Sequence, residues 1–278
     1  MILINFIYPE VAMKKKIILI IIAILVIISG VILTIHFKKP KKEAPPAKAY
    51  FEVNGLSFDF SIESFARANE ETGEVEIPTM DFPDNPDKVE LSLELIYQNP
   101  EYPAGCESMA LTMLLNYFGY QLEKNEIIDN YLIYSDENYV IGYKGRPDIT
   151  PGGGCYAPAL TNTANRFLIQ NKSSYKATNI SGTNLKDLFP YIAKGYPVLV
   201  WTTVGLKPCN KASYIYRYGD TEYTWVYNEH CVVLTGYSIP ENTITVYDSI
   251  DGIKTYNTDD FQKIYDDMWK MSVVLEPK

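Results

Sequence analysis

Apolar residues follow two patterns along this chain: one long uninterrupted run near the N-terminus and several shorter runs after residue 89. The long run covers residues 17–37 and contains no Asp, Glu, Lys or Arg, although lysines flank it on both sides. About 20 apolar residues are enough for a helix to cross a bilayer. The run therefore predicts an uncleaved transmembrane signal-anchor, with residues 1–16 as a short cytoplasmic N-terminus and the rest of the chain outside the cell. The true start is either Met1 or Met13, because three lysines follow Met13.

The next stretch, residues 38–88, has the composition of a linker. Its first part is rich in lysine and proline, which favours a stiff, extended spacer, and residues 69–88 are acidic and rich in Pro and Asp. Between them, YFEVNGLSFDF at residues 50–60 contains a central Asn54-Gly55, a strong signal for a β-hairpin. We therefore expect a linker with a β-hairpin at residues 50–60, followed by one continuous domain over residues 89–278.

A helix that opens at Cys106 is the most strongly predicted element of that domain. Residues 98–119 read QNPEYPAGCESMALTMLLNYFG, in which apolar residues recur at helical spacing and fill most of the helix circumference. Such a helix should be buried, and Gly119 should end it in the left-handed conformation. A thiol in the first turn is close to the positive end of the helix dipole and to free backbone N–H groups, which favour the thiolate. The alternative is a structural cysteine, because free Cys is among the most buried residue types.

The remaining patterns predict an α+β domain. Further helices are expected at residues 124–134, 159–170, 184–194 and 259–268, the last capped by Thr258. Strands are expected at residues 91–97, 197–203, 230–237, 243–247 and 272–275. Because most strands follow the first helices, the elements should be segregated rather than arranged as alternating βαβ units.

Charge and cysteine content exclude several function classes. Seven lysines and one glutamate fall within residues 1–42, so the net charge of −9 for the whole chain becomes −15 for residues 43–278. So acidic a body argues against nucleic-acid binding, which requires a basic surface. The four cysteines show no CxxC spacing, so we expect no metal site and no cofactor. Cys155 and Cys209 both lie in predicted loops, and a disulfide between them is a hypothesis.

Three residues could form a nucleophilic site with Cys106. The chain has two histidines, one of them within the apolar N-terminal run, so only His230 can serve as a base in the domain. A tight hairpin would bring Asp248, at the end of the next strand, back toward His230, where a carboxylate could orient the imidazole. Asp251 remains an alternative. Gln98 precedes the cysteine loop and could donate its amide N–H to a developing oxyanion. The structural alternatives are a core histidine and a surface-loop glutamine.

Four segments of the domain occur in a recognisable order: QNPEYPAGCESMALTMLLNYFG, PVLVWTT, HCVVLTGY and ITVYDSIDG. Together they resemble the papain-like peptidases similar to double-glycine leader (bacteriocin-processing) peptidases, over roughly residues 89–278. The resemblance implies a papain-like cysteine peptidase fold, in which an N-terminal helix that carries the cysteine packs on an antiparallel sheet. It also implies roles for four residues: Cys106 as nucleophile, His230 as base, Asp248 as orienting acid and Gln98 as oxyanion donor. Two features depart from the family pattern. Gln98 lies eight residues before Cys106, a wider gap than usual, and Ser249 stands where proline is common.

These observations lead to one principal hypothesis and two alternatives. The principal hypothesis is a single-pass protein of the cell membrane whose extracellular domain is a cysteine peptidase, cleaving peptide or protein substrates through an acyl-thioester intermediate. The first alternative is a catalytically inactive papain-like module that binds peptides or cell-wall material. The second is a thiol amidase or acyltransferase that acts on peptidoglycan.

Overall fold

The computed structural model describes residues 47–62, 67–68, 75–76 and 86–278. The chain divides into two compact units, Met1–Glu43 and Ala44–Lys278. The first unit, which contains the predicted cytoplasmic N-terminus and the predicted signal-anchor at residues 17–37, lies outside the described residues. Within the described part of the chain, no helix is long and apolar enough to span a membrane.

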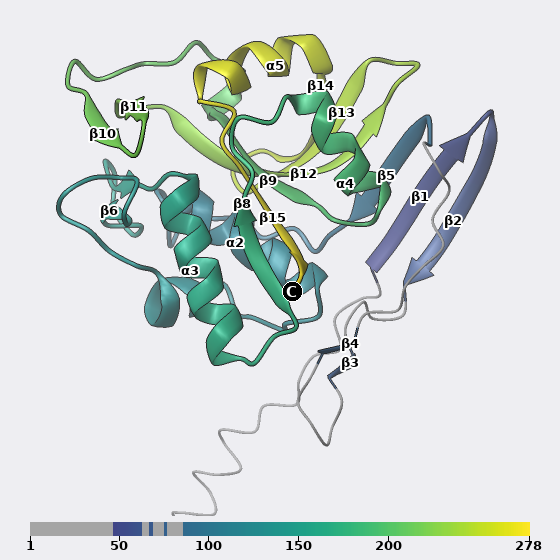
Figure 1. The fold of residues 1–278 in the computed structure, drawn as a ribbon, viewed down its shortest axis with the longest axis horizontal. Helices are drawn as coiled ribbons and strands as arrows, with labels where there is room; N and C mark the ends of the chain where they lie inside the picture. Colours follow the sequence, from purple (N-terminus) through teal and green to yellow (C-terminus); the bar gives the residue numbers. More distant parts are fainter. Residues whose placement is uncertain (1–46, 63–66, 69–74, 77–85) are drawn as a thin grey trace, which may run out of the picture. The chain divides into compact units, whose positions relative to one another are not determined.

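The second unit is built around an antiparallel sheet with nine strands among the described residues (Figure 1). These strands are β1 (Ala47–Val53), β2 (Leu56–Ile62), β5 (Lys88–Ser92), β8 (Tyr175–Asn179), β9 (Val198–Thr203), β12 (Glu229–Ser238), β13 (Thr243–Asp248), β14 (Gly252–Asn257) and β15 (Ser272–Pro277). The order across the sheet is β2-β1-β5-β12-β9-β15-β8, and β13 pairs with both β12 and β14. Short strands form three separate pairs: β3 (Arg67–Ala68) with β4 (Val75–Glu76), β6 (Lys144–Gly145) with β7 (Gly153–Gly154), and β10 (Tyr216–Tyr218) with β11 (Thr221–Tyr223).

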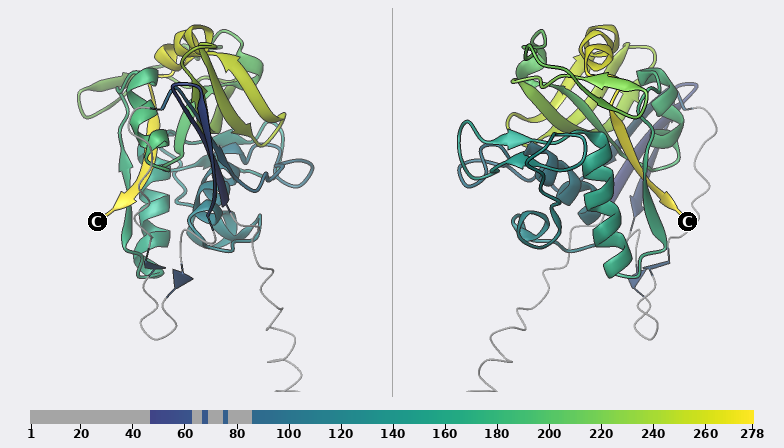
Figure 2. Two further views of the ribbon diagram at one scale, coloured as in Figure 1. Left: turned by 90° about the vertical axis from the view of Figure 1, so that its right-hand side faces the viewer. Right: turned by 60° about the vertical axis from the view of Figure 1, so that its left-hand side comes forward.

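Helices cover the centre of the sheet. The described α-helices are α2 (Cys106–Tyr117), α3 (Ala157–Gln170), α4 (Phe189–Ala193) and α5 (Thr258–Asp267). Helix α2 packs against β12 and β9, α3 against β8 and β15, α4 against β12 and β5, and α5 against β9 and β14. In Figure 1, α2 and α3 occupy the lower half of the domain and α4 and α5 the upper half, and the views of Figure 2 keep α3 and α5 apart. Because β9 and β12 are buried along their whole length, both faces of the sheet are covered at its centre.

The α+β prediction is confirmed, and most of the predicted elements are present with shifted ends. The structure differs at residues 124–134, where only a short π-helical turn, Ile127–Tyr131, forms. Two strands of the main sheet, β8 and β14, were not predicted, nor were the short strands of the three separate pairs. The last helix is capped by Asn257 rather than by Thr258, because the Asn257 side chain accepts hydrogen bonds from the backbone N–H groups of Asp259 and Asp260.

The hairpin expected at residues 50–60 is present, and it belongs to the main sheet. Asn54 and Gly55 have φ angles of 50° and 76°, the left-handed backbone that a two-residue hairpin turn requires. Strand β1 pairs with β5, and the Phe51 side chain is completely buried. The compact unit therefore starts at Ala44, whereas the sequence places the domain boundary at residue 89. Because residues 69–88 are polar and rich in proline, the sequence did not indicate that the hairpin belongs to the same unit as the domain after it.

Helix α2 forms the centre of the core. All of its residues except Asn116 are buried. Gly119 follows the helix with a φ of 90°, as predicted. The burial of α2 against β12 and β9 fixes its first residue, Cys106, beside the start of β12.

Candidate active site

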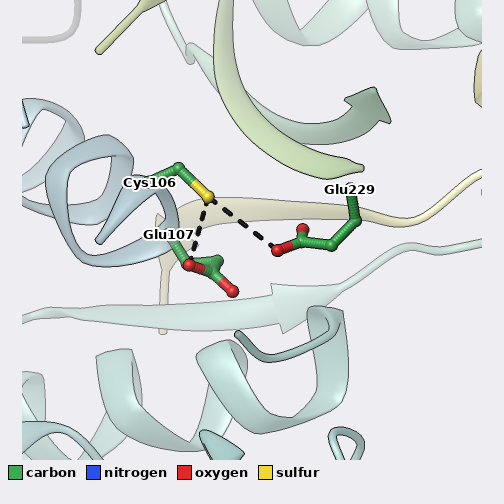
Figure 3. Close-up of side chains that lie close together, drawn as sticks. All are labelled: Cys106, Glu107 and Glu229. Atoms are coloured by element: carbon green, nitrogen blue, oxygen red, sulfur yellow. Dashed lines mark hydrogen bonds between the residues drawn. The ribbon is translucent and has the colours of Figure 1, made fainter. Parts of the chain in front are cut away.

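Cys106 is the first residue of α2, and its thiol is almost completely buried, with 5% of the residue exposed. The sulfur donates a hydrogen bond of 3.2 Å to Glu107 Oε2 and a weaker one of 4.0 Å to Glu229 Oε1 (Figure 3). Burial raises the pKa of Cys106 well above its usual value, and the charges of Glu107 and Glu229 raise it further. The sequence predicts a thiol shifted toward thiolate by the helix terminus. In the structure, burial and the two carboxyl groups outweigh that effect.

Strand β12 begins with Glu229, His230 and Cys231, three consecutive residues that lie close to Cys106 or to Asp248. Glu229 lies near Cys106 because its Oε1 accepts the 4.0 Å hydrogen bond from the sulfur, and the backbone of Cys231 is close enough to act to lower the pKa of the thiol. The His230 ring contacts Asp248, with its Nε2 2.8 Å from Asp248 Oδ1. Both partners of this hydrogen bond are buried, with 1% of His230 and 3% of Asp248 exposed.

The β12–β13 hairpin places Asp248 beside His230. The two strands are antiparallel, with Val233 opposite Tyr247, so the end of β13 returns toward the start of β12. Asp248 Oδ1 also accepts hydrogen bonds from the backbone N–H groups of Ile250 (2.7 Å) and Asp251 (3.1 Å). Burial acts to raise the pKa of Asp248, but the hydrogen bond and charge of His230, together with these two N–H groups, outweigh it and lower the pKa. The side chain of Asp251 is exposed, and Asp248 is the carboxylate that hydrogen-bonds to His230.

Cys106 and His230 lie in the same region of the structure. Among the described residues, no hydrogen bond joins them. The two residues that flank His230 in the sequence lie near the sulfur: Glu229 accepts its hydrogen bond, and the backbone of Cys231 acts to lower the pKa of the thiol. His230 is also close enough to Glu107 for its charge to lower the pKa of that carboxyl group, although burial, the larger effect, raises it. Because Nε2 contacts Asp248, Nδ1 is the ring nitrogen outside that hydrogen bond.

Gln98 is buried and held by the loops on both sides of the site. Its Nε2 donates a 2.7 Å hydrogen bond to the carbonyl oxygen of Pro103, in the loop that leads into Cys106. Its Oε1 accepts a 2.7 Å hydrogen bond from Ser249 Oγ, and its backbone N–H donates to the Ser249 carbonyl oxygen at 2.9 Å. Ser249, the departure from the family pattern, therefore connects Gln98 to the turn that carries Asp248. One N–H of the Gln98 amide is left for another acceptor.

The structure adds two residues that the sequence reasoning missed, Glu107 and Glu229. Both are buried, and Glu107 Oε1 also accepts a short hydrogen bond from the backbone N–H of Cys155. Burial and the neighbouring Glu107 raise the pKa of Glu229 well above its usual value. The sequence offered one signal for these two residues: each glutamate directly neighbours a predicted site residue in the chain. That signal is weak, since neighbouring side chains normally point in different directions.

The same three residues form the one group of potential metal ligands found among the described residues. The Cys106 sulfur and one carboxylate oxygen each from Glu107 and Glu229 lie within 4.8 Å of one another. Thiolate and carboxylate groups are both zinc ligands, and three protein ligands with an open position are typical of catalytic zinc sites. This donor set could therefore hold a divalent cation, although the sequence predicts no metal site.

The structure does not contain the disulfide that the sequence left as a hypothesis. Cys155 and Cys209 are both free thiols in the structure. Cys155 is buried beside Glu107, and Cys209 is half-buried elsewhere on the domain. Cys231 is buried in the core, as the sequence predicts.

Comparison with known proteins identifies the family. The Peptidase_C39-like family model matches residues 90–273. The chain belongs to this family. Among curated relatives, the uncharacterized protein YvpB of Bacillus subtilis (strain 168) is 30% identical over 192 residues, which cover 66% of this chain and 74% of YvpB.

A solved structure of a C39-like peptidase shares the fold. A Bacillus anthracis protein assigned as a C39-like peptidase superimposes with a TM-score of 0.57 at 23% identity, covering 66% of this chain and 94% of its own. The peptidase domain of Streptococcus ComA, a bi-functional ABC transporter, gives a TM-score of 0.40 at 14% identity, covering 67% of this chain and 100% of that domain. The C39-like family and its α+β fold agree with the resemblance noted in the sequence.

Proposed function

We propose that this protein is a cysteine peptidase that cleaves peptide bonds through Cys106, His230 and Asp248. The observation that carries the proposal is the buried 2.8 Å hydrogen bond between His230 Nε2 and Asp248 Oδ1, on the strand against which the Cys106 helix packs. A nucleophile, a base and a group that orients the base are the three parts that thiol catalysis requires. Membership in the C39-like family supports the same chemistry.

In the proposed reaction, His230 Nδ1 takes the proton of the Cys106 thiol while Asp248 holds the Nε2–H. The sulfur forms a bond to the scissile carbonyl carbon, and the carbonyl electron pair moves to oxygen, where the free N–H of Gln98 can stabilise it. When the C–N bond breaks, the leaving amine receives the proton from His230, and an acyl-thioester remains. Water, deprotonated by His230, then hydrolyses the thioester and restores the thiol.

One observation favours a second candidate function, a catalytically inactive module that binds peptides. The Cys106 sulfur is buried and donates its hydrogen bond to Glu107 instead of His230. A peptidase must release the sulfur from this contact before attack, whereas a binding module has no such requirement.

The proposed setting is the cell membrane, with the C39-like domain outside the cell. The support is the uncharged apolar run at residues 17–37, with lysines on both sides. The measurement is membrane fractionation: a variant that lacks residues 17–37 should leave the membrane fraction, and its retention there would contradict the anchor.

The decisive experiment compares Cys106→Ala with Cys209→Ala in the full-length protein, solubilised in detergent. Labelled casein serves as the protein substrate, and mass spectrometry identifies the products. We expect Cys106→Ala to abolish cleavage, because no nucleophile remains. Cys209→Ala should retain it, because that thiol lies outside the site. The wild type should remain active in EDTA, since the proposed reaction uses no metal.

Each of the other outcomes would favour a different function. Cleavage by the Cys106→Ala variant would exclude the thiol mechanism. Peptide binding without cleavage by the wild type would favour the inactive module. Products joined to an added amine rather than to water would indicate an acyltransferase.

A further inference from the structure

Three side chains of metal-binding types meet where the start of α2 packs on the start of β12. The Cys106 sulfur and one carboxylate oxygen each from Glu107 and Glu229 lie within 4.8 Å of one another (Figure 3). All three residues are buried, and they come from two elements that pack against each other in the core. Acidic residues are common on protein surfaces but are almost never fully buried without a partner. The burial of this group therefore requires a physical explanation.

Glu229 supplies a second observation, because one of its oxygens has no partner. Its Oε1 has only the 4.0 Å contact with the Cys106 sulfur, and no donor reaches its Oε2 among the described residues. The residue is 8% exposed, so little of it is open to water. In Figure 3, the carboxyl group of Glu229 points toward Cys106 and Glu107. Buried carboxylates are stabilised by pairing with a charge or by coordinating a metal ion.

Gly154 keeps the space beside both carboxyl groups free of a side chain. A Cβ atom added to this glycine would lie 2.6 Å from Glu229 Oε1 and 2.7 Å from Glu107 Oε1. In the part of the chain that the structure describes, neither glutamate forms an ion pair with a lysine or arginine. A cation bound directly by both carboxyl groups would therefore be an ion rather than a basic side chain.

The donor types favour zinc over calcium and magnesium. Calcium and magnesium prefer six or more oxygen ligands, whereas this group offers one sulfur and two carboxylates. Zinc binds cysteine sulfur and carboxylate oxygen in four-coordinate sites, and three protein ligands leave one position for water. A tetrahedral zinc ion bound at about 2.0–2.3 Å holds its ligand atoms about 3.5 Å apart. The widest pair of donors would therefore close by about 1 Å when the ion binds.

We propose that Cys106, Glu107 and Glu229 bind a zinc ion, and that the bound ion reversibly blocks the Cys106 nucleophile. The blocking role rests on the proposed function, whereas the site itself does not. When the ion binds, the S–H bond breaks, its electron pair forms the bond from sulfur to zinc, and the proton leaves to solvent. A sulfur bound in this way has no free electron pair to attack a carbonyl carbon. Removal of the ion restores the free thiol, so the peptidase reaction itself stays independent of metal.

The first experiment measures metal binding by the untagged full-length protein in detergent, after metal removal with EDTA and dialysis. Cobalt(II) serves as the probe, because a bond from thiolate to cobalt gives a charge-transfer band in the near ultraviolet. We expect one cobalt ion per chain with this band, and its loss when zinc is added. Cys106→Ala should abolish the band, because the sulfur ligand is gone. Cys209→Ala should retain it, because that thiol lies elsewhere on the domain.

The two carboxyl ligands are tested by isothermal titration calorimetry with zinc. We expect Glu107→Gln and Glu229→Gln each to weaken zinc binding by about 10–100-fold or more, since loss of even an outer-shell partner of a metal site has that effect. Glu137→Gln, at an exposed position, is the matched control and should bind zinc like the wild type.

Three results would overturn the site. A wild type that binds cobalt without the charge-transfer band does not use sulfur as a ligand. Zinc binding by Glu229→Gln at the strength of Glu137→Gln would show that the carboxyl group is not a ligand. Calcium or magnesium binding as tight as that of zinc would indicate an ordinary oxygen site. The cobalt spectrum of the wild type decides the outcome even if a glutamate variant fails to fold.

The second experiment measures the block by alkylation with iodoacetamide, followed by mass spectrometry. Saturating zinc should slow labelling of Cys106 by about tenfold or more, because the free thiolate is the nucleophile, and EDTA should restore the rate. Labelling of Cys209 should not change. Equal labelling of Cys106 with and without zinc would overturn the block.

Neither experiment uses turnover, so the two proposals can fail separately. A protein that cleaves nothing but shows the cobalt band and zinc protection would contradict the proposed function alone. A protein that cleaves casein but shows no cobalt band would contradict the zinc site alone.

Discussion

At the scale of single residues, Asp248 shows how burial and hydrogen bonding oppose each other in the site. Burial alone would raise its pKa, but His230 and two backbone N–H groups lower it. A carboxyl group whose pKa is lower in the folded state stabilises the fold above its unfolded pKa. This stabilisation is lost as the pH falls through the lower, folded-state pKa. Asp248 therefore contributes to both stability and the orientation of His230 at neutral pH.

Asp248→Asn should reduce both stability and activity. We expect the free energy of unfolding at pH 7 to fall by about 1.5–3 kcal/mol, the range for a hydrogen bond to a charged group. The difference from the wild type should shrink as the pH falls from about 4, near the unfolded pKa of Asp, through the lower folded-state pKa, where the wild-type carboxylate becomes protonated. The value of kcat/KM should fall by about 10²–10⁴-fold, because the imidazole loses its orienting carboxylate. Denaturant unfolding at several pH values and steady-state kinetics measure these effects.

Asp251→Asn is the matched control, since the Asp251 side chain is exposed and only its backbone N–H contacts Asp248. Both stability and activity should stay close to wild type. An equal loss from the two variants would show that the turn, rather than the Asp248 carboxylate, is what matters.

The sequence indicated four candidate residues, and the structure places His230 against Asp248 and connects Gln98 to both neighbouring loops. The contact between His230 and Asp248 was predictable, because the domain has one usable histidine and one hairpin that returns an aspartate toward it. The carboxyl pair was not predictable. Glu107 and Glu229 are 122 positions apart in the chain, and only the packing of α2 on β12 brings them together. The same packing reverses the predicted shift of the Cys106 pKa.

At the scale of elements, a bulge in β12 sets the alignment of the site. The pairing of β12 with β13 shifts by one residue between Leu234 and Gly236. A one-residue shift changes which face of a sheet each following side chain occupies. The bulge therefore determines which residue of β13 returns to the face of His230.

Gly236→Ala should disturb this alignment. Its Cβ would lie 2.6 Å from the carbonyl oxygen of Val89 on β5, closer than backbone atoms allow. We expect the free energy of unfolding to fall by about 1–3 kcal/mol, as for overpacking, and kcat/KM to fall as well. Thermal unfolding and kinetics test both effects.

Gly182→Ala provides the comparison. This glycine has open space around its Cβ position but a φ of 94°, so alanine should cost about 1 kcal/mol from strain alone. Activity should not change. A Gly236→Ala protein with wild-type activity would show that the bulge does not control the site.

Elements with long, regular apolar patterns were predictable, including α2, α3, β9 and β12. Their periodicity is imposed by burial in the core, so it is visible in the sequence. Strands β8 and β14 are five and six residues long, and polar residues interrupt their apolar ones. Their sequence pattern therefore gave only a weak signal for a strand. Their place in the sheet depends on partners β15 and β13, which only the tertiary structure supplies.

At the scale of the whole molecule, the β1–β2 hairpin extends the sheet beyond the region matched by the C39-like family, which begins at residue 90. Strand β1 pairs along β5, and β5 pairs with the C-terminal end of β12. The hairpin is therefore connected through two strands to the element that carries His230. Its contribution to the fold can be measured by removing the side chain of Phe51, a large residue of the hairpin that is completely buried.

Phe51→Ala should lower the free energy of unfolding by about 3–5 kcal/mol, because the change removes a buried aromatic ring and leaves a cavity. Leu56→Ala, in the same hairpin, removes a side chain from a residue that is 65% exposed and should change stability by no more than about 0.5 kcal/mol. Denaturant unfolding of the two variants gives the comparison. If Phe51→Ala is as mild as Leu56→Ala, the hairpin is an appendage and the domain begins near residue 89. If it is severe and unfolding remains a single transition, the hairpin and the Cys106–His230 region belong to one cooperative unit, because a two-state transition requires the elements to unfold together.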